Sequence, residues 1–401
     1  MVSSHKQSRN LSISVFQPAI DPGAGTYNPK GSLIADNLGF LFDTYSHTKN
    51  TTAGHDRFSL KLAVTDSQLD MWYETGLGRF VQVYDHAQNQ LIGGFVNRVT
   101  ISSAFLNASI GQLLDIDNRV SVLYSPKDVT TYPPISGVTT ETTIAEDADS
   151  QEKYGILEAV LSGGTILDDG TTNWADVIRD KHLDEFRFPN KTDKGVELGG
   201  ETTPVVTLEV LGYYHFLKKF VFSSAVAATT SLGAQLQTIL GADPNGVIST
   251  DYSEIEANAL LVPQQEDRSR LAATIIKELV TLGNDIDDTR RIFGIYHDQK
   301  AKYFTMPGVF EYEISLRDPT QQVHEYGDGP RVEPWNVLPG KWLFITDFMI
   351  GRVPPNTELK NDPRAMFIES VTYTAAEGLS MNGIKASEIP QLLARIGMGI
   401  I

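Results

Sequence analysis

An acidic segment in the second half of the chain has residue types that suit a calcium ion. Asn284 to Thr289 reads Asn-Asp-Ile-Asp-Asp-Thr, which resembles the start of a calcium loop built from oxygen ligands. Such a loop needs glycine at its sixth position and glutamate at its twelfth, and counted from Asp285 this chain has Arg290 and Tyr296 there. The segment is therefore interpreted as a polar turn between a helix and a strand.

The eight histidines are too scattered to indicate a zinc site. No two of them stand three or four residues apart on a predicted helix, the spacing at which two imidazoles share one helix face. We expect each to be solvated or to satisfy a local hydrogen bond. They are His5, His47, His55, His86, His182, His215, His297 and His324.

The motifs of nucleophilic and phosphate chemistry are missing from the sequence. There is no Gly-x-Ser-x-Gly, and Gly25 to Ser32 has glycines and a lysine but not in the order that wraps a phosphate. Asp168-Asp169-Gly170 is a turn signal, and sequence alone cannot pair any two of the 50 carboxylates. The sequence therefore predicts no catalytic, cofactor-binding or metal-binding residue, no cofactor and no enzymatic activity.

Composition narrows the classes of protein and partner. A length of 401 residues predicts two or three domains, and 41% apolar with 21% charged residues is typical of a globular chain. The complete absence of cysteine excludes disulfides, thiolate metal sites and cysteine nucleophiles. A formal charge of −17 disfavours binding to nucleic acid or anionic membranes, and the basic pairs Lys218-Lys219 and Arg290-Arg291 are too short to form a basic stripe.

The clearest structural signal is a run of strands from Phe58 to Tyr124. Phe58, Leu60, Leu62 and Val64 alternate with polar or small residues, as in an antiparallel strand with one buried face. Further strands are expected at 79–84, 91–102, 107–110 and 119–124, and an earlier one at 11–15. Gly93-Gly94 indicates a bulge or a sharp corner. Short strands joined by tight turns favour a small closed β-barrel or a sandwich, and we expect a β-barrel over residues 1–130.

The middle of the chain, residues 131–265, is expected to hold a linker and an α+β region that contributes to a second barrel. Residues 125–153 are rich in threonine, proline and acidic residues, as in a linker or long surface loop. Asn173 is expected to cap a helix with Trp174, Val177 and Ile178 on one side, which ends before Pro189. A buried strand at 204–210 and a helix capped by Ser231 follow.

The last part of the chain, residues 266–401, is expected to be a small domain of a helix and strands, followed by returning barrel strands and a C-terminal helix. Leu271, Ile275 and Leu279 form an apolar helical stripe that ends at Gly283. Strands are expected at 291–296, 300–305, 311–316, 341–350 and 365–374, and Ser387 is expected to cap the final helix. The predicted fold class is therefore mainly β with α+β insertions.

Two longer passages resemble a known family. The residues from 71 to 125, "MWYETGLGRFVQVYDHAQNQLIGGFVNRVTISS" followed by "GQLLDIDNRVSVLYS", look like the opening barrel of tail-tip or baseplate hub proteins of long-tailed bacteriophages. In addition, "TLEVLGYYHFL" at 207–217 resembles the step from barrel to helix in such hubs. "RRIFGIYHDQKAKYF" at 290–304 resembles their small α/β insertion.

The resemblance implies a structural protein of the virion, a viral tail component made in the host cytoplasm. Such hubs are homotrimeric rings with two related β-barrels per subunit, which match the sixfold tail tube above and hold a spike or fibre below. The expected partners are further copies of the chain, a tail tube or distal tail protein, a spike or fibre protein and the tape-measure protein. DNA would only pass through the lumen, and no membrane is involved. The second barrel would be assembled from residues 155–225 and 305–375.

Two other functions stay open at this stage. One is a distal-tail adaptor or other neck or tail ring protein, which would be hexameric instead of trimeric. The other belongs to a different class, a carbohydrate-binding or hydrolytic module that uses exposed aromatic side chains. The candidates for that surface are Trp72, Tyr73, Tyr213 and Tyr214.

Overall fold

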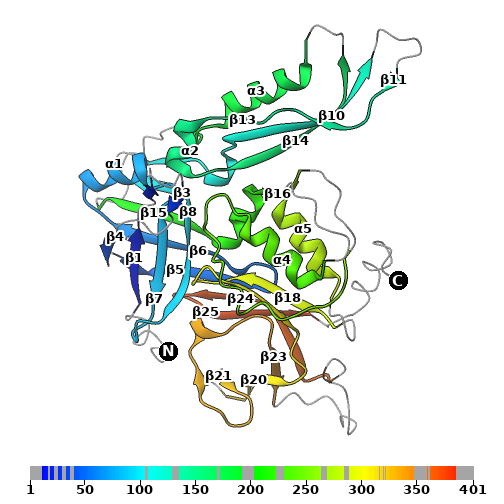
Figure 1. Cartoon of the computed structure of the whole chain (residues 1–401). Coiled ribbons are helices and arrows are strands. Elements are labelled where there is room, and N and C mark those ends of the chain that lie inside the picture. The colour runs from blue at the N-terminus through cyan, green and yellow to red at the C-terminus, as the bar shows by residue number, and fades with distance from the viewer. Residues whose placement is uncertain are drawn as a thin grey trace.

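The structure is a computed structural model that describes residues 11–384, apart from 17–18, 22–25, 29–32, 37–39, 104–106, 129–134, 169–171, 192–202, 223–229, 263–268, 284–288, 316, 319, 321, 347–358 and 360–361. Figure 1 shows a body organised around one large sheet and an arm that projects from one end of it. The calcium-like segment from 284, Gly25 to Ser32 and the helix expected after Ser387 lie wholly or largely outside the described residues.

One 16-stranded sheet runs through the body. The paired strands follow the order β22 (Arg331–Val332), β21 (Val323–Glu325), β20 (Phe310–Ile314), β23 (Trp342–Ile345), β24 (Ala365–Thr374), β5 (Phe40–Asn50), β6 (Gly54–Ala63), β15 (Val205–Gly212), β8 (Gln90–Ser102), β7 (Phe80–Tyr84), β1 (Ser12–Phe16) and β4 (Leu33–Asp36). Beside this path lie β9 (Asn107–Ile110) on β8, β25 (Gly378–Ile384) on β24, and the hairpin of β18 (Arg291–Ile295) and β19 (Ala301–Thr305) on β6.

The mainly β fold with α+β insertions is confirmed, and the N-terminal barrel takes the form of a curled half-barrel sheet. Among the described strands, the pairing continues from β5 to β24 and does not return to β4. The expected closed barrel is therefore open at that edge. Closure would need β4 to pair with the far side of the sheet, but β5 already has β6 and β24 as its two neighbours.

The long strands pack differently on their two faces. Phe58, Leu60 and Leu62 of β6 are buried in one core, while Lys61 points to solvent, which confirms the predicted alternation. Strands β7 and β8 are buried on both faces. Phe80 and Phe95 face a second core made with the α4 (Leu232–Gly241), α5 (Ala272–Thr281) and η4 (Tyr213–Lys219) helices. These helices cover the sheet in Figure 1, so β7 and β8 lie between two apolar layers.

A helix interrupts the strand run that was expected to be continuous. α1 (Asp66–Thr75) begins at the N-cap Thr65, where the Gln68 side chain accepts a hydrogen bond from the Thr65 backbone N–H at 2.9 Å. Leu69, Trp72 and Tyr73, three and four residues apart, form its buried face. The sequence therefore contains the capping pair and the helical spacing, although only over ten residues.

Strand β15 comes from the middle of the chain and fills the gap between β6 and β8. Its residues pair antiparallel with both neighbours over most of its length. The strand predicted at 204–210 is confirmed, but it belongs to the first half-barrel and not to a second barrel built from 155–225. The sheet therefore crosses the boundary expected at residue 130.

Gly93 and Gly94 have another role than the bulge expected there. A Cβ atom on Gly94 would lie 2.1 Å from the carbonyl oxygen of Leu211 in β15. In the pairing of β8 with β15, the register shifts between Glu209 and Val210, so that Asn97 of β8 has no partner residue in β15. Gly94 is therefore required because the backbones of β8 and β15 approach closely. An irregular step in the pairing of β7 with β8 lies nearby, between Val83 and Tyr84 and opposite Leu91.

The helices and the hairpin predicted from longer patterns are confirmed. α3 (Trp174–Phe186) begins at Asn173, α4 begins at Ser231, and α5 ends before Gly283, whose φ is +76°. β18 and β19 form the hairpin expected around His297-Asp298-Gln299. The strand expected at 365–374 is β24 with the same bounds.

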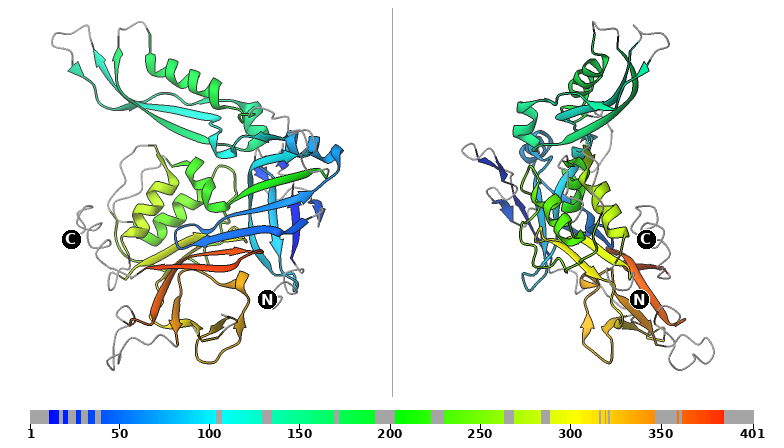
Figure 2. Two further views of the ribbon diagram at one scale, coloured as in Figure 1. Left: turned by 180° about the vertical axis from the view of Figure 1, so that it is seen from behind. Right: turned by 45° about the vertical axis from the view of Figure 1, so that its right-hand side comes forward.

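The C-terminal strands form a lobe on the edge of the half-barrel. Tyr312, Val323, Leu343, Ile368 and Val371 supply its own small core. Pairing of β24 with β5 joins this lobe to the half-barrel (Figure 2). The strands expected in a second barrel from 305–375 are thus present, and they continue the first sheet. A short hairpin of β2 (Ala19–Asp21) and β3 (Thr26–Asn28) and a pair of β16 (Val221–Phe222) and β17 (Arg270–Leu271) complete the body with η3 (Leu113–Asp115) and η5 (Pro334–Asn336).

Candidate assembly surface

The arm is a separate five-stranded sheet with one long helix. Its centre is β10 (Arg119–Asp128), which pairs in parallel with β14 (Glu158–Asp168). The other edge of β10 carries β11 (Ile135–Ser136), β12 (Thr140–Glu141) and β13 (Ala145–Glu146), and α2 (Ala148–Tyr154) follows. The described residues of the segment expected to be a linker or long surface loop, 125–153, thus include the end of β10, the short strands β11, β12 and β13, and most of α2.

The helix α3 packs on this sheet through a thin apolar layer. Val122, Ile166 and Ala175 are the buried members, with Tyr124 and Leu161 partly buried beside them. Asn173 caps the helix by accepting a hydrogen bond from Ala175 N–H, and Arg179 ties it to the carbonyl oxygen of Thr143 at 2.9 Å. Polar contacts therefore supplement a small core.

The arm carries most of the exposed large apolar side chains among the described residues, with Ile144 at the cavity between the arm and the body. The helix was expected to carry Trp174, Val177 and Ile178 on one side. Of these, Trp174 is 48% exposed and Ile178 is 43% exposed, while Ala175 is buried. Six of the ten exposed large apolar residues among the described part of the chain belong to this arm. They are Val138, Ile144, Trp174, Ile178, Phe186 and Phe188. We call these six residues the arm surface.

Asparagine side chains fix the root of the arm. Asn118 is completely buried, donates from Nδ2 to the carbonyl oxygen of Gly155 at 2.8 Å and accepts from Leu157 N–H at 2.8 Å. Asn245 makes the same double contact with the backbone of Ile156, at 2.7 and 2.8 Å. Because a buried amide loses water on folding, these pairs hold the chain in one position where the arm leaves the body.

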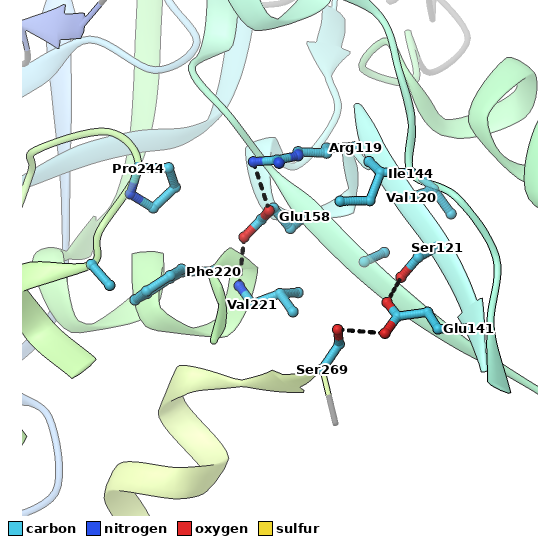
Figure 3. Close-up of a pocket in the computed structure, with 12 residues that line it drawn as sticks. Arg119, Val120, Ser121, Glu141, Ile144, Glu158, Phe220, Val221, Pro244 and Ser269 are labelled. Carbon is cyan, nitrogen blue, oxygen red and sulfur yellow. Dashed lines mark hydrogen bonds and ion pairs between the residues drawn. The ribbon is translucent and has the colours of Figure 1, made fainter. Parts of the chain in front are cut away.

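Two carboxylates bridge the arm and the body around a cavity of about 150 Å³. Figure 3 shows Glu158 between Arg119, at 3.1 Å, and the backbone N–H of Val221, at 2.6 Å. Glu141 accepts hydrogen bonds from Ser121 of the arm and Ser269 of the body. Burial raises the pKa of Glu158, although the hydrogen bond from Val221 and the charge of Arg119 oppose the shift.

A charged cluster closes the other side of the junction. Asp117 accepts from the ammonium of Lys219 at 2.5 Å and contacts Nε2 of His182 on α3 at 2.7 Å. The arm helix, the arm strand and the body segment η4 therefore meet at one carboxylate. Lys219 is thus engaged within the protein, as are Arg290 with Glu369 and Arg291 with Glu256. These basic residues do not form a free patch for nucleic acid.

The histidines occupy several different places. His182 and His215 each contact a carboxylate, of Asp117 and Asp56 respectively. His47 of β5, His55 of β6 and His297 in the turn between β18 and β19 lie near one another, which sequence spacing did not indicate. Across the described residues, no group of three or more histidine, aspartate or glutamate side chains is placed to hold a metal ion. Nor does any helix in this part of the chain have the length and apolar character needed to cross a membrane.

The aromatic residues considered for carbohydrate binding are not on the surface. Trp72 and Tyr213 are completely buried, Tyr73 is 8% exposed, and Tyr214 packs against the helical core. Phe80 and Tyr213 stack with ring centroids 5.5 Å apart. The surface that this hypothesis requires is therefore not formed by these four residues.

Comparisons with known proteins return little. No protein-family model matches the chain, and no curated protein matches it. Among solved structures, it is similar to the tail protein from Neisseria meningitidis MC58, with 7% sequence identity and a TM-score of 0.37, over 92% of this chain and 94% of that one. A likeness at that level carries no argument about fold or function.

The arm surface is the feature that sequence reasoning missed. The signal that could have found part of it is the spacing of Trp174 and Ile178, four residues apart in α3, because residues at that spacing share one side of a helix. The side chain of α3 that is buried against the sheet is the small Ala175, so these two large side chains stay uncovered.

Proposed function

We propose that this chain is a structural component of a bacteriophage tail tip or baseplate, a subunit of a hub ring that joins the tail tube to a spike or fibre. The observation that carries the proposal is the arm surface, which extends from the body and exposes apolar side chains. The sequence resemblance of β7, β8 and the strand β10 to the hub barrel supports the choice of family. The role is structural, without catalysis and without a cofactor or metal.

Exposed apolar side chains favour an interaction with another protein subunit. Single exposed apolar residues are ordinary, but a cluster rimmed by charged groups marks an interface. Around Trp174 and Ile178 lie Arg179, Asp176 and Asp180, which contact one another. A ring places the same arm against the next copy of the chain, so each arm surface would be covered once the ring closes.

The proposed partners follow from the ring. They are further copies of the chain, with three favoured and six as the alternative, then a tail tube or distal tail protein on one side and a spike or fibre protein on the other. The tape-measure protein would occupy the lumen before DNA passes through it. The net charge of −17 suits such transit because like charge limits binding of DNA. The protein would be made in the host cytoplasm and would reside in the virion.

A distal-tail adaptor is the second candidate within the same class. It would use the same half-barrel and arm in a sixfold ring. The number of copies in the ring distinguishes the two, because the hub is proposed as a trimer and the adaptor as a hexamer. Imaging of the assembled ring by electron cryomicroscopy gives three or six copies directly.

The experiment that tests the proposal measures self-association of the purified chain. Mass photometry and light scattering should show a ring at micromolar concentration. Ile178→Asp should shift the population to monomers, because a carboxylate placed in an apolar interface loses its water without gaining a partner. Val309→Asp is the matched control, since Val309 is also an exposed aliphatic residue but lies on the C-terminal lobe, 64% exposed.

Two outcomes would count against the proposal. The first is a wild-type chain that stays monomeric at all concentrations and does not appear in purified tails. The second is an equal loss of association in Ile178→Asp and Val309→Asp, since that would mean that the arm surface has no special part. Thermal unfolding of both variants must match that of the wild type, so that dissociation is not caused by unfolding.

A further inference from the structure

A second cavity lies in the body, far from the arm surface. It has a volume of about 270 Å³ and lies where β5, the start of β6, the β18–β19 hairpin and the segment after η5 meet. Its lining is rich in cationic and titratable side chains, in a chain whose net charge is −17. The groups that carry the argument are Lys49, His55, His297, Lys302 and Lys341.

Lys49 is the unusual member of the lining. It is 2% exposed, and its ammonium donates to the backbone carbonyl oxygen of Trp335 at 2.8 Å. Within the described part of the chain, no carboxylate lies at ion-pair distance from it. A carbonyl oxygen stabilises an ammonium far less than an anion does, and a buried charge without a counterion is costly.

The other two lysines differ from Lys49. Lys302 pairs with Glu254 at 2.5 Å, and Lys341 pairs with Glu311 at 2.5 Å. The carboxylates of Glu254 and Glu311 neutralise the charges of these two lysines. Lys49 is therefore the lysine of the lining that has no carboxylate partner in the described part of the chain. A ligand that enters the cavity would therefore meet one unpaired ammonium and two paired ones.

Two imidazoles complete the wall. The rings of His55 and His297 stack with centroids 5.4 Å apart, and His55 is 1% exposed. Nδ1 of His55 is buried and has no hydrogen-bond partner in the structure. Gln90 holds the turn in place by donating to the carbonyl oxygen of His297 at 3.0 Å. A buried polar nitrogen without a partner beside a cavity indicates that something in the cavity completes its hydrogen bonding.

We propose that this cavity binds a small oxyanion of the phosphate class, with Lys49 as its main cation and His55 as a hydrogen-bond donor. A tetrahedral oxyanion offers oxygens in several directions and so suits donors on different walls better than a planar group does. The volume is several times that of a water molecule, for which about 30 Å³ is needed in the liquid. The proposal does not depend on the function proposed above.

The titration behaviour of the cavity is consistent with this assignment. Burial lowers the pKa of Lys49 to about 7, and burial together with the charge of Lys49 lowers that of His55 well below its usual value. The other titratable side chains that line the cavity are Tyr296, His297, Lys302 and Lys341. Charged or titratable neighbours of these groups outside the lining are His47, Glu254, Asp298 and Glu311. A bound oxyanion would favour the charged forms of Lys49 and His55 and would raise both pKa values.

The test uses inorganic phosphate with the full chain at pH 7. Thermal unfolding is followed against phosphate concentration and against sodium chloride at equal ionic strength. The wild type should show a saturable rise in Tm with phosphate alone. Lys49→Met should weaken apparent affinity about tenfold or more, since it removes a hydrogen bond from a charged donor. Lys61→Met, on the solvent side of β6, is the matched control and should behave as the wild type.

A second measurement keeps the test decisive if Lys49→Met does not fold. Histidine ring resonances of the wild type, assigned with His55→Gln, should show that phosphate raises the pKa of His55. Equal rises in Tm with phosphate and chloride, or a His55 titration that phosphate leaves unchanged, would overturn the proposal. So would a folded Lys49→Met that binds phosphate as tightly as the wild type.

Discussion

The half-barrel and the arm bury their apolar side chains to very different degrees. In the body, β7 and β8 lie between two cores, and residues such as Phe80, Val81 and Phe95 have no exposed surface. In the arm, one thin layer around Val122 and Ala175 holds the helix on the sheet, while Trp174 and Ile178 face outward. The apolar side chains of β7 and β8 are thus buried within the chain, whereas the arm leaves large apolar side chains exposed.

The largest expected effect of a single substitution lies in the body, at Trp72. Its side chain is completely buried in the half-barrel core and is covered by the guanidinium of Arg79, 4.8 Å from the ring centroid. Trp72→Ala should lower the free energy of unfolding by about 3–5 kcal/mol, because it leaves a large cavity. Urea unfolding followed by circular dichroism measures the change. A loss below about 1 kcal/mol would show that the half-barrel is not packed as described.

Gly94 should give the next largest loss. Alanine there would bring its Cβ to 2.1 Å from the Leu211 carbonyl oxygen, so β8 and β15 would have to separate. We expect Gly94→Ala to cost about 1–3 kcal/mol, as overpacking does. Gly308→Ala is the control, because a Cβ on Gly308 would have no atom within 4 Å. Equal stability of the two variants would contradict the close approach of the strands.

Gly94 also shows what the sequence could and could not predict. Two adjacent glycines in a strand indicate a special backbone requirement, and that much was readable. The atom responsible belongs to Leu211, more than a hundred residues later, and no local pattern pairs β8 with β15. The same limit applies to β6, whose alternation predicted a strand correctly but not its neighbour β15.

Local sequence patterns predicted strands and helices correctly where apolar residues recur at the regular spacing of a strand or a helix. The alternation of Phe58 to Val64 and the stripe of Leu271, Ile275 and Leu279 both correspond to observed elements. α1 was missed because its ten residues are too few to show a repeated helical pattern of apolar residues. In addition, the glycines after it suggested a turn between strands. The helix α3 and the first part of β10 were predicted, but the short strands β11, β12 and β13 were missed, because threonines and acidic residues in that segment are typical of a linker.

The candidate sites depend on contacts between distant segments. Lys49 lies in β5, His55 in β6, and His297 in the turn between β18 and β19. His55 and His297 are about 240 residues apart, so the histidines looked scattered in the sequence. The exposure of Trp174 likewise follows from the small size of the sheet beneath α3, which the helix sequence alone does not contain. The helix could be predicted, but which of its faces is covered could not.

A substitution at the junction between the arm and the body should lower the free energy of unfolding less than Trp72→Ala does. Its effect should be confined to the arm. Asn118→Ala removes two hydrogen bonds to the backbone of Gly155 and Leu157 and should cost about 1–3 kcal/mol. Hydrogen exchange should show that the amides of β10, β14 and α3 lose protection while those of β6 and β8 keep it. Asn382→Ala, at an exposed position, is the control. A uniform loss across both regions would mean that the arm does not open separately.

Glu158 allows the junction to be tested by pH. Because burial raises its pKa in the folded state above the ordinary value of 4.5, the folded chain binds its proton at a pH where the unfolded chain has released it. The contribution of Glu158 to stability therefore grows as pH falls from neutral through this raised pKa, and levels off below 4.5. Glu158→Gln should remove that dependence, whereas Glu152→Gln, on the exposed side of α2, should keep it. Identical pH profiles of the wild type and Glu158→Gln would contradict the burial of this carboxylate.

Trp174 is the sharpest counterpart to Trp72 because the residue type is the same and only the region differs. Trp174→Ala removes a side chain that is 48% exposed, so we expect a change in the free energy of unfolding of only about 0.5 kcal/mol for the monomer. The same substitution should weaken association of the subunits, because aromatic side chains contribute strongly to interfaces. Urea unfolding at low concentration and mass photometry at high concentration separate the two effects. If Trp174→Ala destabilised the monomer as much as Trp72→Ala does, the arm would bury its tryptophan within the chain, and the contrast between the two regions would fail.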